Sequence, residues 1–393
     1  MKQGWEYGIL DDAVKKSSSN ISLNKIKDEE GNYPVFGAKG FAKNVSFFDQ
    51  NKDYLAIIKD GAGIGRVSKH PKNSSVLATL QYIIPKDGFD IDFIKYFLNQ
   101  VDFEKHRNGS TIPHIYFKDY KTEPFPLLPL SEQKRIVKIL DEAFAAIDKA
   151  KANAEKNLQN SRELFDSYLN KVFAPSAGIR LNSAEGSGQR NPEEDWEEKK
   201  LGKVCDFVRG PFGGSLKKQI FVEDGYAVFE QSHAIYNQFE RIRYFINDDK
   251  FKEMSRFEIR PGNLIMSCSG TMGKVSIVPD GVKQGIINQA LLLLKPNGSL
   301  FNKFLKYWIE SDSFQESLKM YSQGAAIQNV ASVKTLKEIQ IHFPSLPIQK
   351  KIVKKLDEIS SESKKLEAIY QQKLADLEEL KKSILQKAFD GEL

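Results

Sequence analysis

Three glycines at alternate positions are the part of this sequence that most resembles a cofactor site. Residues 60–67 are DGAGIGRV, and the spacing of Gly61, Gly63 and Gly65 is similar to part of a dinucleotide-binding fingerprint. That fingerprint requires a helix directly after the glycines, because the N-terminus of the helix holds the phosphate. Here the residues SKHPKNSS follow, and their proline and turn formers favour a second strand. We therefore predict a strand, a turn and a strand rather than a cofactor site.

Other residue types that commonly carry catalysis are thinly spread. The two cysteines, Cys205 and Cys268, form neither a metal-binding pair nor a disulfide framework, which fits a reducing cytosol. The five histidines are dispersed, and the sequence contains no phosphate-binding Gly-Lys-Ser/Thr loop, no nucleophile elbow and no Asn-Pro-Pro-Tyr motif for amine methylation. A site assembled from distant residues remains open. The motifs themselves predict no catalytic centre, no metal and no cofactor in this chain.

Composition sets further bounds. The 393 residues predict two or three domains, and 58 Lys and Arg against 52 Asp and Glu give a net charge of +6. This small excess permits a polyanionic partner, but it fits an ordinary lysine-rich surface equally well. The N-terminal residues lack an apolar signal core, and no run of 18 apolar residues occurs. We therefore expect a soluble, cytoplasmic protein.

The elements that would position any site are present twice. Residues 133–173 align without a gap onto residues 349–389, so that QKRIVKILDE corresponds to QKKIVKKLDE. Weaker matches precede each copy in the same order, such as FIKYFL (residues 93–98) with FLKYWI (residues 304–309). An ordered series of matches indicates duplication. Each unit is predicted to be a variable globular region followed by a near-constant helix.

Both repeated segments have the period of a coiled-coil helix. Apolar residues recur at alternating steps of three and four over about 40 residues. The predicted seam residues are Ile136, Leu140, Ile147, Leu164 and Tyr168 in the first segment, and Ile352, Leu356, Ile359, Leu366, Leu377, Leu380 and Ile384 in the second. We expect the two helices to pack on each other in antiparallel fashion. The alternative is that each helix packs only on its own globular domain.

These observations predict an α+β protein with a pseudo-twofold internal repeat. Two globular domains would be separated by the two long, antiparallel coiled-coil helices. The expected boundaries are a first globular domain at 1–128, a first long helix at 129–174, a Gly/Ser/Pro-rich linker at 175–195, a second globular domain at 196–345 and a second long helix at 346–393.

The sequence resembles the specificity (S) subunit of type I restriction–modification enzymes over essentially its whole length. The motifs that carry this resemblance are the repeated helix opening (LPLSEQKRIVKILDE and LPIQKKIVKKLDE), the ending QKAFDGEL and a Trp-Glu pair that opens each variable region. The second helix opening is shorter and lacks the Glu before Gln349.

The resemblance implies a function in DNA recognition. Each globular region would be a target recognition domain for one half of a bipartite, asymmetric DNA sequence, and the helices would dock two methyltransferase subunits and, where present, restriction subunits. S-adenosylmethionine, ATP and Mg²⁺ would be used by those partners and not by this chain, which would be non-catalytic. Two alternatives are a stand-alone DNA-binding methyltransferase and a coiled-coil scaffold protein.

Candidate DNA contacts are basic or amide-bearing residues of predicted loops, because Arg, Asn and Gln bind base edges and Lys neutralises phosphate. In the first region they are Lys39, Lys43, Asn44, Arg66, Lys69, Arg107, Asn108, Ser110, Thr111 and His114. In the second they are Arg209, Lys217, Lys218, Gln231, His233, Arg241, Arg243, Lys274, Gln323, Gln328 and Asn329. The alternative for each of them is an ordinary solvated surface role.

Overall fold

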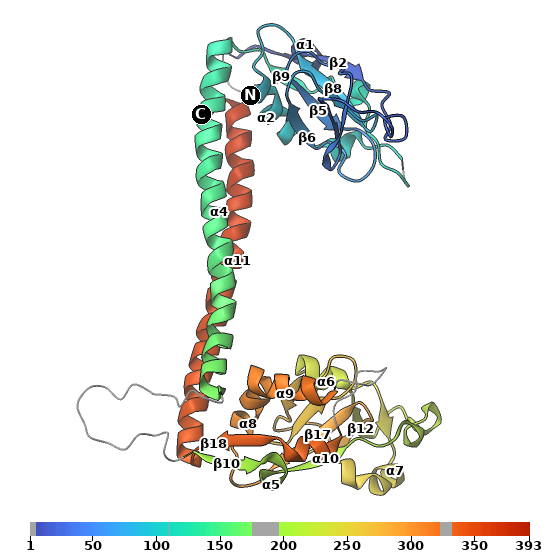
Figure 1. The fold of residues 1–393 in the computed structure, drawn as a ribbon, viewed down its shortest axis with the longest axis vertical. Helices are drawn as coiled ribbons and strands as arrows, with labels where there is room; N and C mark the ends of the chain where they lie inside the picture. Colours follow the sequence, from blue (N-terminus) through green and yellow to red (C-terminus); the bar gives the residue numbers. More distant parts are fainter. Residues whose placement is uncertain (1–4, 110, 175–195, 323–331) are drawn as a thin grey trace, which may run out of the picture. The chain divides into compact units, whose positions relative to one another are not determined.

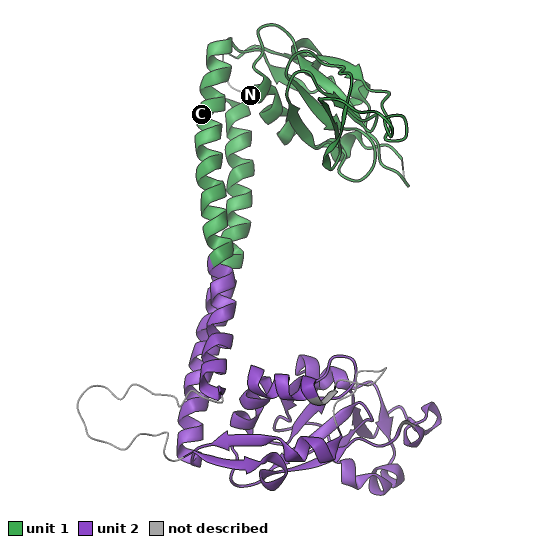
Figure 2. Cartoon of the chain, in the orientation of Figure 1, with its two compact units in different colours: residues 1–156, 370–393 green, residues 157–369 purple. Residues whose placement is uncertain are grey.

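The computed structural model describes residues 5–109, 111–174, 196–322 and 332–393. By compactness the chain divides into two units (Figure 2): unit 1 comprises Met1–Lys156 and Tyr370–Leu393, and unit 2 comprises Asn157–Ile369. Unit 1 holds the first globular domain (domain 1, residues 5–129), and unit 2 holds the second (domain 2, residues 196–345). Each unit also contains part of both long helices. The predicted linker at 175–195 lies outside the described residues.

The two repeated segments form long helices, labelled in Figure 1. Helix α4 spans Leu130–Phe173 and α11 spans Leu346–Asp390, with 44 and 45 residues. Neither helix contains glycine. The proline of α11, Pro347, stands in the first turn, where its missing N–H would have no partner in the helix.

The helices pair in antiparallel fashion within each unit. In unit 1, Lys151 Nζ lies 2.5 Å from Glu378 Oε1, and Lys381 Nζ lies 3.1 Å from Asp148 Oδ1. In unit 2, Arg162 bonds to Glu367. Five predicted seam residues are buried: Ile136, Leu140, Ile147, Ile352 and Leu356. Five more are partly buried: Tyr168, Ile359, Leu366, Leu377 and Ile384.

Two predicted seam residues lie elsewhere. Leu164 and Leu380 are 47% and 46% exposed, and the small residues Ala154, Ser161 and Ser363 are buried. A straight helix drifts about 20° per heptad from a strict 3.5-residue repeat. Leu164 follows Ile136, and Leu380 follows Ile352, by four heptads. A prediction that counts strict heptads from the start of each helix therefore selected Leu164 and Leu380, although both lie outside the buried face.

Domain 1 contains three small sheets. A two-stranded sheet pairs β1 (Tyr7–Ile9) with β9 (Pro124–Pro126). The four-stranded sheet has the order β2 (Val14–Ser18), β8 (Leu80–Pro85), β5 (Tyr54–Ile58) and β6 (Val67–His70), and the three-stranded sheet has the order β4 (Gly40–Val45), β3 (Tyr33–Gly37) and β7 (Ser75–Val76). The helices are α1 (Leu10–Ala13), α2 (Ile91–Gln100) and α3 (Phe117–Tyr120), with a short 3₁₀ turn at Phe103–His106. Every residue of β5, YLAII, is buried, as its unbroken apolar sequence predicts.

Domain 2 repeats this topology with a different sequence. β10 (Glu197–Lys200) pairs with β18 (Gln340–Phe343). The four-stranded sheet runs β11 (Cys205–Arg209), β17 (Leu291–Pro296), β14 (Leu264–Ser267) and β15 (Val275–Ile277), and the three-stranded sheet runs β13 (Phe245–Ile246), β12 (Tyr226–Phe229) and β16 (Gly285–Ile287). The helices are α5 (Leu201–Val204), α6 (Gln231–Tyr236), α7 (Asp248–Glu253), α8 (Asn302–Glu310), α9 (Asp312–Ser322) and α10 (Val333–Glu338). In both domains one pair of the three-stranded sheet is parallel, β3 with β7 and β12 with β16. The predicted α+β fold with an internal repeat is confirmed.

The C-terminal end of each long helix belongs to the core of the domain that the other helix follows in sequence. Leu169, Val172 and Phe173 of α4 are buried in the core that contains α8 of domain 2. The matching residues of α11, Leu385, Ala388 and Phe389, are buried against α2 of domain 1. The alternative in which each helix packs only on its own globular domain is therefore wrong.

The glycine-rich stretch forms the predicted strand, turn and strand. β5 and β6 are antiparallel, and Gly61, Gly63 and Gly65 in the connecting turn have φ of +89°, +93° and +80°. At Gly65 a Cβ atom would also lie 2.6 Å from Phe103, so this position requires glycine for both reasons. Among the helices of the described ranges, none has an apolar stretch long enough to cross a membrane.

Candidate nucleic-acid interface

Each four-stranded sheet has one edge at which loops converge. In domain 1, β2 and β5 end at this edge, while β6 and β8 begin there. In domain 2 the equivalent strands are β11 and β14, which end there, and β15 and β17, which begin there. We call this feature the strand-end edge of each domain. Because several connecting loops meet there, it is where a small sheet can present many polar side chains together.

In domain 1 the strand-end edge brings together residues that are distant in sequence. The 108–114 loop packs onto the glycine turn: Gly61 N donates to Pro113 O at 2.9 Å, and His114 forms backbone bridges with Asp60 and Asn108. The Arg66 guanidinium donates to Ala38 O of the β3–β4 hairpin, which places Arg66 beside the hairpin tip that carries Lys39. Arg66, Asn108 and Lys39 are exposed. Thr111 is exposed in the same loop.

Three other predicted DNA contacts of domain 1 form polar interactions within the domain. Lys69 forms an ion pair with Asp92 of α2, and Arg107 pairs with Glu104. Lys43 Nζ donates to Lys27 O. Lys43 and Asn44 pair with Val35 and Pro34 in the first half of β3, whereas the hairpin tip follows the other end of that strand.

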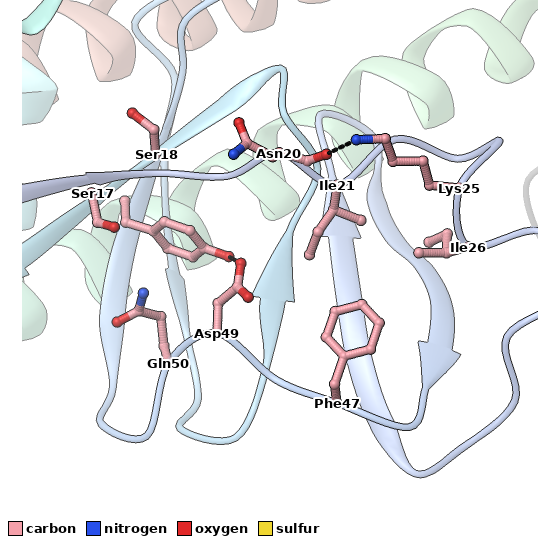
Figure 3. A pocket seen from close by; sticks show the side chains of 10 residues that line it. Ser17, Ser18, Asn20, Ile21, Lys25, Ile26, Phe47, Asp49 and Gln50 are labelled. Carbon is pink, nitrogen blue, oxygen red and sulfur yellow. Dashed lines mark hydrogen bonds between the residues drawn. The ribbon is translucent and has the colours of Figure 1, made fainter.

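A polar hollow of about 560 Å³ begins where β2 ends (Figure 3). Asp49 lies on one side of it and Phe47 on another. Tyr82 also lines the hollow, and its hydroxyl donates to Asp49 Oδ2 at 2.8 Å. The amides of Asn20 and Gln50 also line the hollow. Amide side chains can bind adenine through two hydrogen bonds. Neither amide was among the predicted contacts, because the two lie in separate loops that nothing in the sequence connects.

In domain 2 the strand-end edge gathers several predicted residues. Arg209 is the last residue of β11, and Lys274 immediately precedes β15. Gln231 Nε2 at the start of α6 donates to Ser269 O in the β14–β15 turn at 2.6 Å. Lys217 and Lys218 are exposed in the loop that follows β11. Gln289, just before β17, is also exposed, and the sequence analysis missed it.

The strand-end edge of domain 2 contains a buried thiol next to charged side chains. Burial raises the pKa of the Cys268 thiol to about 12, and the Arg209 guanidinium partly opposes the shift. Arg243 pairs with Glu230 and also lies over the Tyr244 ring. Arg241 is exposed beside them.

His233 requires a correction. Its side chain is only 1% exposed, Nδ1 bonds to the backbone of Glu230, and Nε2 bonds to the Arg241 carbonyl. Both ring nitrogens are therefore occupied inside the domain, and His233 is not available to DNA. The sequence around His233 does not predict this burial, because the partner of Nε2, the Arg241 carbonyl, comes from a separate loop.

Both domains are held to their helices by the same polar contacts. Gln133 and Gln349 are each 0% exposed. The Gln133 amide accepts a bond from Asp90 N and donates to Gly88 O and Leu128 O. The Gln349 amide accepts from Phe301 N and donates to Ser299 O and Pro344 O. The glutamine that both helix openings share thus fills three backbone hydrogen-bonding positions in each unit.

The Asp of each LDE triplet has a matching role. Tyr96 donates to Asp141 Oδ1 at 2.5 Å, and Tyr307 donates to Asp357 Oδ1 at 2.6 Å. Burial and the neighbouring carboxylate raise the pKa of both tyrosines. The glutamine and the aspartate that the two helix openings share therefore anchor a domain in each unit.

A family model provides the deciding comparison. The model described as "Type I restriction modification DNA specificity domain" matches residues 2–157 and 193–375, which cover both domains and most of both helices. This chain belongs to that family.

Curated members of the specificity family are distant relatives. The chain is 24% identical over 298 residues to the type I restriction enzyme EcoBI specificity subunit of Escherichia coli, an alignment that covers 72% of this chain and 61% of that protein. It is 22% identical over 413 residues to the MjaVIII specificity subunit of Methanocaldococcus jannaschii, covering 100% of this chain and 93% of that protein. The resemblance noted from the helix motifs is confirmed.

Solved structures of the specificity family share the fold. A chain from a study of complex assembly and conformational transition of the type I R-M system superimposes with a TM-score of 0.73 at 18% identity, covering 100% of this chain and 99% of that chain. The HsdS subunit from Thermoanaerobacter tengcongensis gives a TM-score of 0.61, also at 18% identity, with 99% and 97% covered. At these identities the likeness concerns the fold.

Four predicted contacts of this specificity-family chain fall outside the described residues. They are Ser110, Gln323, Gln328 and Asn329. The loop 108–114 is otherwise described and lies on the strand-end edge of domain 1. Its counterpart in domain 2 remains a prediction.

Proposed function

We propose that this chain is the DNA-recognition subunit of a type I restriction–modification complex and binds a bipartite, asymmetric target. The observation that carries the proposal is that two domains of one topology present different side chains at the same strand-end edge. Domain 1 offers Arg66, Asn108 and Lys39 there, whereas domain 2 offers Arg209 and Gln231. Arg and amide side chains are the groups that discriminate base edges, so two different sets suit two unrelated half-sites.

The helices are proposed to dock two copies of a methyltransferase subunit. Several exposed residues are identical at equivalent positions of α4 and α11, among them Lys134 with Lys350 and Lys138 with Lys354. Leu164 and Leu380 are also equivalent, and both are about half exposed. Identical surface residues on two helices suit two copies of one partner. Restriction subunits would join the same complex.

The chemistry is proposed to belong to the partners. Methyl transfer from S-adenosylmethionine and ATP- and Mg²⁺-dependent cleavage would be carried by the methyltransferase and restriction subunits. The chain would act where the cell's DNA is, in the cytoplasm.

One experiment tests the proposal directly. The chain is incubated with labelled S-adenosylmethionine and mixed-sequence DNA, alone and with the methyltransferase subunit proposed as its partner. Label is expected only in the joint reaction, and methylated adenines are expected in a single bipartite motif. Label transfer by the chain alone would favour a stand-alone methyltransferase, and an absence of any sequence preference would favour a scaffold.

A further inference from the structure

The loop after β11 in domain 2 presents a phenyl ring to solvent. Phe212 is 93% exposed, more than any other large apolar side chain among the described residues. Phenylalanine is usually buried, so a nearly bare ring forgoes the free energy that burial would supply.

The backbone around this ring is held on both sides. Gly210 N donates to Leu291 O at 3.0 Å, and a Cβ atom at Gly210 would lie 1.9 Å from Asn288 O, so the chain can pass here only as glycine. Pro211 is buried. Ser215 N then donates to Phe212 O at 2.9 Å. The loop therefore presents the ring from a constrained backbone, and little backbone entropy would be lost when the ring binds.

The loop that carries the ring is rich in cations. Arg209, Lys217 and Lys218 flank it in sequence, and residues 209–220 contain no carboxylate. In the described part of the chain these three cations take part in no ion pair. A single apolar ring among unpaired cations suits a polyanion with stacked bases better than it suits an apolar protein surface.

Domain 1 has no equivalent ring. After β2 the chain continues through Ser19, Asn20 and Ile21, and Ile21 is only 9% exposed. A ring exposed directly after this strand is thus a feature of domain 2, whereas domain 1 exposes a ring elsewhere, at Phe41 of β4.

We infer that Phe212 inserts into the DNA duplex within the half-site bound by domain 2 and stacks on bases at one step. Apolar side chains inserted in this way unstack a base step, and the flanking cations hold the phosphates on either side. This inference rests on the proposed function, because it assigns a contact within the same DNA interface.

The test uses the full complex of this chain with its methyltransferase and the target sequence found by methylation profiling. Duplexes carry 2-aminopurine at successive positions of each half-site. With the native complex, fluorescence should change at one or two adjacent positions of the domain 2 half-site. Phe212→Ala should abolish that change and weaken target binding by about 10- to 100-fold. Phe212→Trp should restore both, and Phe212→Leu should restore neither fully.

The ring is solvent-exposed, so these variants should fold normally, which circular dichroism would verify. Val222→Ala, at a 38% exposed position elsewhere in domain 2, is the matched control and should bind as the native complex does. If the native complex prefers its target but Phe212→Ala matches it in affinity and fluorescence, the inference about Phe212 is wrong and the proposed function stands. A native complex without target preference would overturn the proposed function, and the inference with it.

Discussion

The phenyl ring of Phe389, near the end of α11, packs on Phe93 of α2 with 5.1 Å between the ring centroids. Unit 2 contains the equivalent pair, Phe173 of α4 with Phe304 of α8, at 5.2 Å. Each long helix therefore ends inside the core of the domain that it does not follow in sequence.

Removal of the Phe389 ring should destabilise domain 1 specifically. Phe389→Ala leaves a cavity beside Phe93 and Phe97 and should lower the free energy of unfolding of unit 1 by about 3–5 kcal/mol. Hydrogen exchange should show lost protection in residues 5–129 and unchanged protection in domain 2. Leu380→Ala, at a 46% exposed position of the same helix, is the control and should change stability by less than about 0.5 kcal/mol. Equal loss of protection in both domains would contradict this assignment.

Replacement of the buried glutamines should weaken the junction between each domain and its helix. Gln133→Met keeps the approximate side-chain volume but leaves Asp90 N, Gly88 O and Leu128 O without their partner. We expect a loss of about 1–3 kcal/mol in chemical denaturation, because buried backbone groups lose hydrogen bonds. Gln349→Met should lower the stability of unit 2 by a similar amount. The neighbouring Lys134→Met, on the exposed face, supplies the comparison and should be nearly neutral.

His70 should make domain 1 sensitive to acid. Burial lowers the pKa of His70 to about 4, and its ring packs between Phe36 and Tyr54. The unfolded state then binds a proton at higher pH than the folded state does, so stability is full above about pH 6.5 and declines as pH falls toward 4. Urea denaturation at pH 7 and pH 5 should show this difference, and His70→Gln should reduce it. His342→Gln, at an exposed histidine, should leave the native difference intact. The idea fails if His70→Gln and the native chain respond to pH identically.

Arg209 should contribute to DNA binding through its place on the strand-end edge of domain 2. Arg209→Ala in the complex with methyltransferase should weaken target binding by about 5- to 150-fold, as loss of a bidentate base contact does. Arg260→Ala is a matched control, because Arg260 pairs with Glu258 and precedes the opposite end of β14. Filter binding across a range of salt concentrations would measure both. A larger effect of Arg260→Ala would place the interface at the other end of the sheet.

The two thiols should be unreactive in the folded chain. Cys205 and Cys268 are 2% and 0% exposed, and burial raises the pKa of each thiol to about 12. At pH 8 neither should react quickly with a thiol reagent, whereas both should react after denaturation. Rapid labelling of one thiol under native conditions would indicate that the edge of domain 2 opens readily.

Much of the architecture was predictable from local patterns. The apolar period of residues 133–173 and 349–389 predicted both helices, and the strand, turn and strand around Gly63 followed from the proline and turn formers after it. The repeat placed Gln133 and Gln349 at equivalent positions. It did not predict that each is buried or that each bonds to three backbone groups, because those groups lie in other segments.

The candidate interface was only partly predictable. Residue type selected Arg66, Arg209 and Gln231, which the fold places at the strand-end edges. The same criterion selected His233, which is buried, and it passed over Phe212, because a search for basic and amide side chains excludes an exposed aromatic ring. The residues PFGG around Phe212 were the available signal, since proline and glycine mark a loop in which an apolar residue has no core to enter.

Local sequence patterns were sufficient to predict the duplication, the two helices and the strand, turn and strand around Gly63, because hydrophobic period and turn chemistry act between residues a few positions apart. The folded structure was needed to show that Phe389 joins the core of domain 1 and which loops meet at each strand-end edge. Those outcomes depend on how distant surfaces pack, and a contact between distant segments leaves no periodic trace in either of them.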